Sequence, residues 1–176
     1  MIKDWKVHSR RRVFGKYGRN IDEVMYEMPN GNVVDFYIKV EGHATCIFAL
    51  TDDNKVIMAQ QYRPGPGKVI TEMPGGGIDE GEEPKIAAVR ELLEETGYQA
   101  SEATFVTSVM KDAYSTMNCE VFVATGCHKV SEPQNTETET TEVVLLSIDD
   151  FRNHLRTGQL SDTAAGYLAL DSLKLL

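Results

Sequence analysis

The sequence predicts an α+β domain, in which a mixed β-sheet is flanked by helices in an α/β/α arrangement. Short apolar segments of strand length are far more numerous than helical ones, and several of them are joined as hairpins. Asn30-Gly31 stands between two such segments and is the strongest short hairpin signal in the chain. The length of 176 residues and a hydrophobic content of 41% suit one domain with a buried core.

The N-terminal segment is basic, with seven Lys or Arg residues and one Asp among its first 20 residues. A nucleic-acid-binding arm would have such a charge, but apolar side chains are interleaved with the basic ones here, which favours a strand. Residues 23–28 and 33–40 follow as two strands, joined through Pro29-Asn30-Gly31-Asn32. The interleaved apolar residues are Trp5, Val7, Val13, Phe14 and Tyr17.

The middle of the chain predicts three further strands. Residues 44–50 and 56–62 form an antiparallel pair around the turn Asp52-Asp53-Asn54. Residues 63–68 form a loop, because prolines at 64 and 66 cannot donate hydrogen bonds to a strand ladder. Residues 69–73 then lead into Pro74-Gly75-Gly76-Gly77, a segment whose glycines allow the backbone to approach a ligand closely.

A helix is predicted over residues 84–96. Pro84 suits a first helical turn, Glu82 and Glu83 favour the positive helix start, and Gly97 suits the end. Strands are expected at 104–109, 118–124 and 143–147, and two closing helices at 148–157 and 162–175.

The helix over 84–96 concentrates acidic side chains. At about 100° per residue, Ile86, Val89, Leu92 and Leu93 share the sector expected to face the core, whereas Glu91 and Glu95 lie opposite, with Glu94 beside them. Crowded carboxylates repel one another unless a cation compensates, and oxygen ligands select Mg²⁺ or Mn²⁺. The pattern therefore indicates metal-assisted attack of water on a phosphorus–oxygen bond, unless this is an ordinary solvated acidic face.

The spacing of these residues resembles the Nudix hydrolase box, G-x5-E-x7-R-E-U-x-E-E-x-G-U, where U is apolar. Gly76, Glu82 and the run Arg90-Glu91-Leu92-Leu93-Glu94-Glu95-Thr96-Gly97 match it. Tyr98 replaces the usual final aliphatic residue and can still bury its ring. The resemblance implies the Nudix fold and hydrolysis of a nucleoside diphosphate linked to another moiety.

Carried over to this chain, the box implies metal ligands and a supporting pair. Glu91, Glu94 and Glu95 would bind Mg²⁺, with Mn²⁺ as an alternative, and Glu95 would be the bridging ligand. The carbonyl of Gly75 or Gly76 could add an oxygen ligand. Arg90 would orient the acidic cluster together with Glu82.

A second segment resembles the ADP-ribose and nucleoside diphosphate sugar pyrophosphatases of this family. It consists of Gln61-Tyr62-Arg63, a Pro/Gly loop and Glu72-Met73-Pro74-Gly75-Gly76. Arg63 would then bind a phosphate, unless it is a surface arginine, and Glu72 would bind the base or hold the glycine loop. In that branch the N-terminal strands pack across a homodimer, so residues 1–42 are expected at the dimer interface of a single-domain protein whose Nudix domain covers 43–176.

Catalysis also requires a base that deprotonates water. In this branch the base is often a glutamate in an acidic loop before a late strand. Residues 137–142 form such a loop, and Glu139 is the expected base, with Glu142 as second choice and a plain solvated loop as the alternative. Glu139, Glu94 and Arg90 are therefore the predicted catalytic residues.

The sequence does not distinguish between several nucleotide substrates. Residues 111–118 lack the Pro-Gly stretch of many ADP-ribose enzymes, and Tyr114 occupies a position at which some dinucleoside polyphosphate hydrolases carry tyrosine. Tyr114 could equally stack on a base or sugar, or be a buried strand residue. The prediction is a nucleotide-sugar pyrophosphatase; a dinucleoside polyphosphate hydrolase and a non-catalytic ADP-ribose-binding module are the alternatives.

Few features of the sequence bear on the cellular compartment and the binding partners. No signal or membrane-spanning segment is recognisable, and the three cysteines show neither metal-ligand nor paired spacing, which favours the cytoplasm. The expected partners are a nucleotide-sugar substrate and a second copy of the chain, with neither nucleic acid nor membrane.

Overall fold

The computed structural model describes residues 2–137 and 139–176. Within it the chain divides into two compact units. The N-terminal unit comprises the chain up to His43 together with Met110–Asn118, and the sandwich unit comprises Ala44–Val109 and Cys119–Leu176.

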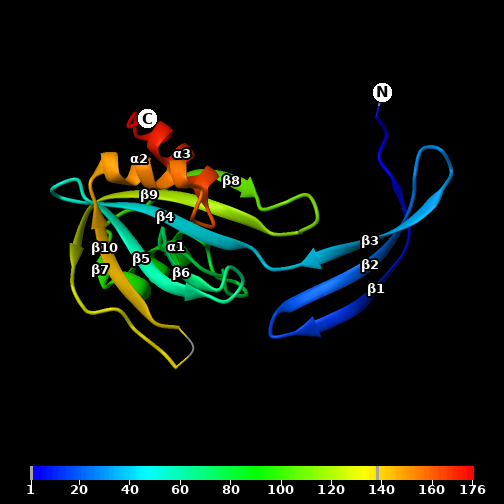
Figure 1. The fold of residues 1–176 in the computed structure, drawn as a ribbon, viewed down its shortest axis with the longest axis horizontal. Coiled ribbons are helices and arrows are strands. Elements are labelled where there is room, and N and C mark those ends of the chain that lie inside the picture. Colours follow the sequence, from blue (N-terminus) through cyan, green and yellow to red (C-terminus); the bar gives the residue numbers. More distant parts are fainter. Residues whose placement is uncertain (1, 138) are drawn as a thin grey trace. The chain divides into compact units, whose positions relative to one another are not determined.

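The N-terminal unit is built on a three-stranded antiparallel sheet of β1 (Lys6–Lys16), β2 (Arg19–Glu27) and β3 (Val33–Val40), drawn in blue in Figure 1. The predicted hairpin joins β2 to β3, and Gly31 in its turn adopts φ 85°, which favours glycine. The basic segment is a strand, as its interleaved apolar residues indicated. Its guanidinium groups bind carboxylates of β2: Arg10 and Arg12 contact Asp22, and Arg11 contacts Glu23.

The returning segment Met110–Asn118 completes this unit beside β3. The amide of Lys39 donates to the carbonyl of Tyr114 at 2.8 Å, and the amide of Thr116 donates to that of Lys39 at 2.9 Å. The Tyr114 ring stacks on Phe36, with centroids 6.5 Å apart, and Phe36 also contacts Trp5 and Tyr26. Tyr114 therefore belongs to a small aromatic cluster and is half exposed rather than buried.

The sandwich unit contains a seven-stranded mixed sheet with the order β10-β5-β4-β9-β7, in which β6 pairs with β5 and β8 with β9. β4 runs parallel to β9 and antiparallel to β5, whose other neighbours β6 and β10 are also antiparallel to it. The strands are β4 (Ala44–Thr51), β5 (Val56–Arg63), β6 (Lys68–Glu72), β7 (Tyr98–Gln99), β8 (Thr104–Met110), β9 (Asn118–Lys129) and β10 (Thr141–Leu146).

Helices cover both faces of this sheet, which confirms the predicted α+β fold with an α/β/α sandwich (Figure 1). α1 (Pro84–Thr96) packs with Ile47 and Ala49 of β4 on one face. α2 (Ile148–Thr157) and α3 (Thr163–Ser172) pack with Cys46, Phe48 and Leu50 on the other. The alternation along β4 is the period of two expected of a strand buried on both sides.

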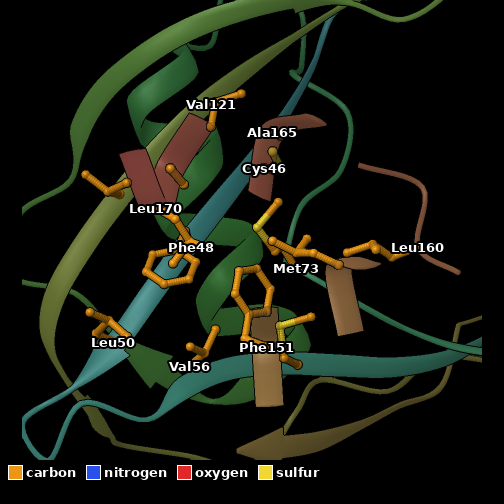
Figure 2. Packing of buried hydrophobic residues seen from close by; sticks show 14 of the residues in the cluster. Cys46, Phe48, Leu50, Val56, Met73, Val121, Phe151, Leu160, Ala165 and Leu170 are labelled. Carbon is orange, nitrogen blue, oxygen red and sulfur yellow. The ribbon is translucent and has the colours of Figure 1, made fainter. Parts of the chain in front are cut away.

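The core between the sheet and the last two helices is aromatic at its centre. Figure 2 shows Phe48 of β4 beside Phe151 of α2, with ring centroids 5.1 Å apart. Met73, Val56 and Leu170 lie around them, and all five side chains are buried. This packing anchors the end of β6 and therefore the start of the glycine segment.

The bounds of α1 and α2 agree with the prediction, and Leu92 and Val89 of α1 face the core as expected, but the predicted positions of Ile86 and Glu95 are wrong. Ile86 is 57% exposed, whereas Ala87, Ala88 and Leu92 are buried. Two small side chains allow the helix to approach the sheet closely, so they displace the bulky Ile86 from the contact. Glu95 lies one turn beyond Leu92 on this side and is buried as well, not on the solvent face.

Other differences are in element lengths. The third helix covers Thr163–Ser172, shorter than the expected 162–175, and β9 extends to Lys129. β7 has only two residues, too few for a periodic pattern, and pairs with His128 and Lys129 of β9. Among the described residues, no helix is long and apolar enough to cross a membrane.

Candidate active site

The glycine segment lies between β4 and α1. The amides of Thr45 and Ile47 in β4 donate to the carbonyls of Gly76 and Pro74, each at 2.9 Å. A Cβ atom at Gly75 would stand 2.3 Å from the Thr45 carbonyl oxygen. One at Gly76 would stand 2.5 Å from Oε1 of Glu91. Glycine is therefore required at position 75 for the segment to lie against the backbone of β4, and at position 76 it leaves room for the carboxylate of Glu91.

Glu95 is the buried acid of the site, at 5% exposure. Its Oε2 accepts a hydrogen bond from the amide of Gly75 at 2.9 Å, and its Oε1 accepts one from Nε2 of Gln61 at 3.0 Å. Burial raises the pKa of Glu95 to about 7, and the charges of Glu91 and Glu139 add to the increase, although the Gly75 hydrogen bond opposes it. The protein alone thus disfavours a negative charge at this carboxyl group.

Arg90 links the glycine segment to the acids of α1. Its Nε and Nη2 donate to the two carboxylate oxygens of Glu82 at 2.9 and 3.0 Å. Its Nη1 donates to Glu91 at 2.7 Å and to Glu94 at 3.0 Å, and Nη2 also reaches the carbonyl of Gly77 at 3.1 Å. The bidentate contact lowers the pKa of Glu82 to about 2. One guanidinium group therefore orients three of the four box carboxylates, two of them on α1.

A pocket of about 370 Å³ opens beside these acids. Glu91, Glu94 and Glu95 line it from α1, and Glu139 lines it from the segment before β10. The charge of Glu139 contributes to the raised pKa values of Glu91 and Glu95, although burial is the largest cause for both. Glu142, the second choice as base, is exposed on β10, where it lies opposite Gln60 of the neighbouring strand β5. The remaining lining residues are Gln134, Asn135, Thr136 and Thr141.

Comparison with known proteins identifies the family. The family model of the NUDIX domain matches residues 41–164, most of the chain. The chain belongs to the Nudix family. The predicted family and its hydrolase class are thereby confirmed.

Two curated relatives match over most of their own lengths. The chain is 32% identical over 166 residues to an ADP-ribose pyrophosphatase of Bacillus subtilis, covering 92% of this chain and 89% of that one. It is 30% identical over 156 residues to a methanol dehydrogenase activator of Bacillus methanolicus, covering 85% and 83%. A solved structure of an ADP compounds hydrolase superposes with a TM-score of 0.83 at 22% identity, over 99% of this chain and 96% of that one, which supports the Nudix fold.

The oxygen donors of the Nudix box fit a hard divalent cation. Glu91, Glu94 and Glu95 supply carboxylates only, and burial together with the neighbouring acids raises the pKa of Glu95, so a cation would favour its ionised form. In the described residues these groups are turned toward Arg90, Gln61 and Gly75 and do not form a ready-made cluster of three ligands. The Gly76 carbonyl accepts from Thr45, and the carbonyl of Gly75 is the other candidate ligand.

Arg63 of β5 and Glu72 of β6 contact each other. Glu72 is 2% exposed, and its Oε2 accepts a hydrogen bond from Nε of Arg63 at 2.5 Å. The hydroxyl of Ser161 donates to the second oxygen, Oε1. Glu72 therefore orients Arg63 and ties the end of β6 to the start of α3. Their roles in substrate binding stay predictions, as does that of Tyr114, which lies in the N-terminal unit.

Sequence reasoning missed three polar residues at the site. Gln61 contacts Glu95, and Asn135 and Thr141 flank Glu139 in the pocket lining. Gln61 could have been found, because it is two residues before Arg63 in a strand and so shares a face with it. Asn135 and Thr141 belong to no recognisable motif, and their importance comes from contacts that only the folded chain creates.

Proposed function

We propose that this Nudix protein hydrolyses the pyrophosphate bond of a nucleoside diphosphate sugar, ADP-ribose or an ADP- or GDP-linked hexose, to a nucleoside monophosphate and a sugar phosphate. The observation that carries the proposal is the pocket in which the three box glutamates lie with Glu139. The similarity to an ADP-ribose pyrophosphatase over 92% of the chain supports the substrate class.

Glu91, Glu94 and Glu95, with the Gly75 carbonyl, would hold Mg²⁺, with Mn²⁺ as an alternative. The bound cation supplies positive charge that neutralises the pyrophosphate and polarises its phosphorus–oxygen bonds. Arg90 orients Glu91 and Glu94 for this purpose through contacts of 2.7 and 3.0 Å. Gln61 and the Gly75 amide hold Glu95 in place.

The remaining residues act on water and substrate. Glu139 accepts the proton of the attacking water as general base. Arg63, fixed by Glu72, offers its guanidinium group to a phosphate of the substrate. Tyr114, which is 54% exposed, would offer its aromatic ring to the base or sugar.

We also propose that the chain forms a homodimer through its N-terminal strands and resides in the cytoplasm. The sheet of β1–β3 exposes apolar side chains that a second copy would cover, among them Phe14 and Tyr37 at 50% and 54% exposure. Light scattering on the purified chain tests this: a monomer at micromolar concentration, or a dimer unaffected by the double substitution F14D/Y37D, contradicts the proposed interface.

The test of the activity is incubation of the purified chain with Mg²⁺ and a substrate panel, with products identified by mass. The panel comprises ADP-ribose, ADP-glucose, GDP-mannose, NADH and diadenosine polyphosphates. We expect a nucleoside monophosphate and a sugar phosphate from at least one nucleotide sugar. Preferential cleavage of a diadenosine polyphosphate would favour the dinucleoside alternative, and ADP-ribose binding without products would favour the non-catalytic module.

A further inference from the structure

The C-terminal end of α1 docks the segment that carries Glu139. The last carbonyl groups of a helix have no partner within it and must find one elsewhere. Here the carbonyl of Glu94 accepts a hydrogen bond from the amide of Gln134 at 2.7 Å, and that of Glu95 accepts one from Oγ1 of Thr141 at 2.8 Å. The helix that supplies the acidic side chains therefore also fixes both ends of the neighbouring segment through its main chain.

Asn135 closes the same segment upon itself. Its Oδ1 accepts a hydrogen bond from the amide of Thr141 at 2.8 Å, and its Nδ2 approaches the carbonyl of Thr141 at 3.5 Å. Inside this closure, the amide of Thr136 donates to the carbonyl of Glu139 at 2.8 Å, and the amide of Glu139 donates to Oγ1 of Thr136 at 3.1 Å. The backbone of Glu139 is thus tied on both sides.

Thr141 joins these two sets of contacts. It is 4% exposed, and its hydroxyl lies between the Glu95 carbonyl and Oδ1 of Asn135, which is 3.2 Å away. A buried hydroxyl in such a position costs free energy unless it is hydrogen-bonded, so its geometry is tightly specified. The distance between Glu139 and the acids of α1 is consequently set by the Thr141 and Asn135 contacts.

We propose that Thr141 and Asn135 are positioning residues, which hold Glu139 at the acidic face of the pocket so that it can deprotonate the attacking water. The inference rests on the proposed function, because it takes Glu139 to be the base. A base must lie within hydrogen-bond reach of its proton, and a displacement of about 1 Å can cost roughly 100-fold in rate. Neither residue needs to touch the substrate for this effect.

The decisive variant is T141V, which removes the hydroxyl group and keeps the shape. We expect kcat to fall by about tenfold to 100-fold while KM stays within about twofold. T141S restores the hydroxyl group and should recover most of the rate, and N135A should behave like T141V. T51V is a matched control: Thr51 is also buried, its Oγ1 accepts from the Lys55 amide at 2.9 Å, and it does not line the pocket.

A double-mutant cycle separates the positioning role from a purely structural one. If Thr141 acts through Glu139, T141V should change kcat little in an E139Q background. If the losses of kcat in T141V and E139Q multiply in the double variant, the inference is overturned. It is also overturned if T51V loses as much kcat as T141V does. A shift of the half-activating Mg²⁺ concentration in T141V also overturns it, because the substitution would then act through Glu95.

The same experiments distinguish this inference from the proposed function. A wild-type chain that cleaves no member of the panel contradicts the proposed function, and the inference fails with it. An active wild type with an unaffected E139Q variant contradicts the assignment of Glu139 as base and the inference with it, but it leaves the proposed reaction and substrate class intact.

Discussion

The molecule contains two arginine–carboxylate clusters with opposite balance. In the N-terminal sheet, two guanidinium groups share one carboxylate: Arg10 contacts Asp22 at 2.7 Å, and Arg12 contacts its other oxygen. At the pocket, one guanidinium group serves three carboxylates, because Arg90 contacts Glu82, Glu91 and Glu94. The first cluster has surplus positive charge and the second surplus negative charge.

The difference separates a structural cluster from one that is incomplete without a ligand. The hydrogen bond from Arg12 lowers the pKa of Asp22, so the folded protein favours its ionised form. Burial and neighbouring acids instead raise the pKa of Glu95 to about 7. Carboxylates that are destabilised in the protein alone are those that a divalent cation can stabilise. This difference can be tested by substitutions that change the balance of positive and negative charge in each of the two clusters.

The largest effect is expected from E95Q at the negative cluster. Loss of the buried carboxylate should lower kcat at saturating Mg²⁺ by about 100-fold or more, because one metal ligand and its charge are removed. Circular dichroism should show an unchanged fold, since glutamine keeps the size and the hydrogen-bond acceptor at Oε1. Steady-state rates on the cleaved nucleotide sugar give the measurement. Full activity of E95Q would exclude Glu95 as a ligand.

The next effect is expected from a comparison of R90M with R12M. R90M releases Glu82, Glu91 and Glu94, so the acids lose their orientation, and kcat/KM should fall by about 10- to 100-fold. R90K should recover only part of the loss, because an ammonium group cannot reproduce the bidentate contact with Glu82. R12M leaves Asp22 paired with Arg10 and should keep kcat within about twofold. Equal losses in R90M and R12M would contradict the distinction between the clusters.

The pH dependence of stability should separate Glu95 from Glu82. The pKa of Glu95 is raised from 4.5 to about 7, so the folded state binds more protons than the unfolded state between these values. The metal-free protein should therefore lose about 3 kcal/mol of unfolding free energy as pH rises from 5 to 8, and E95Q should abolish this loss. Urea unfolding of both proteins at pH 5 and pH 8, with a chelator present to keep them metal-free, measures this loss of unfolding free energy. If the unfolding free energies of wild type and E95Q changed by the same amount between pH 5 and pH 8, the burial of an ionisable Glu95 would be contradicted.

Glu82 should behave in the opposite sense. Its pKa is lowered from 4.5 to about 2 by Arg90, so its contribution to stability is complete above pH 4.5 and disappears as pH falls toward 2. E82Q should reduce the acid sensitivity of the protein in this range without removing the change between pH 5 and 8. Thermal midpoints from pH 2.5 to 8 would show whether the two groups act in separate windows.

The fold was largely predictable because its signals are local. The Asn30-Gly31 turn, the helix bounds at Pro84 and Gly97, and the alternating strands depend on residues close in sequence. The core face of α1 was predicted correctly at Leu92 and Val89 but wrongly at Ile86, since hydrophobicity alone places Ile86 in the core. The close approach of helix and sheet, which favours Ala87 and Ala88, depends on the partner surface and cannot be deduced from the helix itself.

Less of the candidate site than of the fold could be predicted from the sequence. The box spacing located the acids of α1, and the resemblance to the ADP-ribose pyrophosphatase branch led to Glu139 in the acidic loop, which does lie at the same pocket. Arg90, which orients Glu91 and Glu94, was predicted as well. The contacts of Glu95 and of the Glu139 segment come instead from Gln61, Asn135 and Thr141, which are 34 to 46 residues from Glu95 or pair across a loop. Long-range polar contacts of single residues produce no periodic pattern, so they become visible only in the folded chain.

The smallest effect is expected from D22N in the N-terminal sheet. Removing this charge leaves Arg10 and Arg12 facing each other without a counterion, so Tm at pH 7 should drop by a few degrees. D4N is the control, because Asp4 is exposed in the same unit and should leave Tm unchanged. At 1 M NaCl the difference between D22N and wild type should shrink, since salt screens the repulsion of exposed guanidinium groups. A deficit that persists undiminished at high salt would mean that Asp22 acts through packing, and the two arginine clusters would then differ in more than their charge balance.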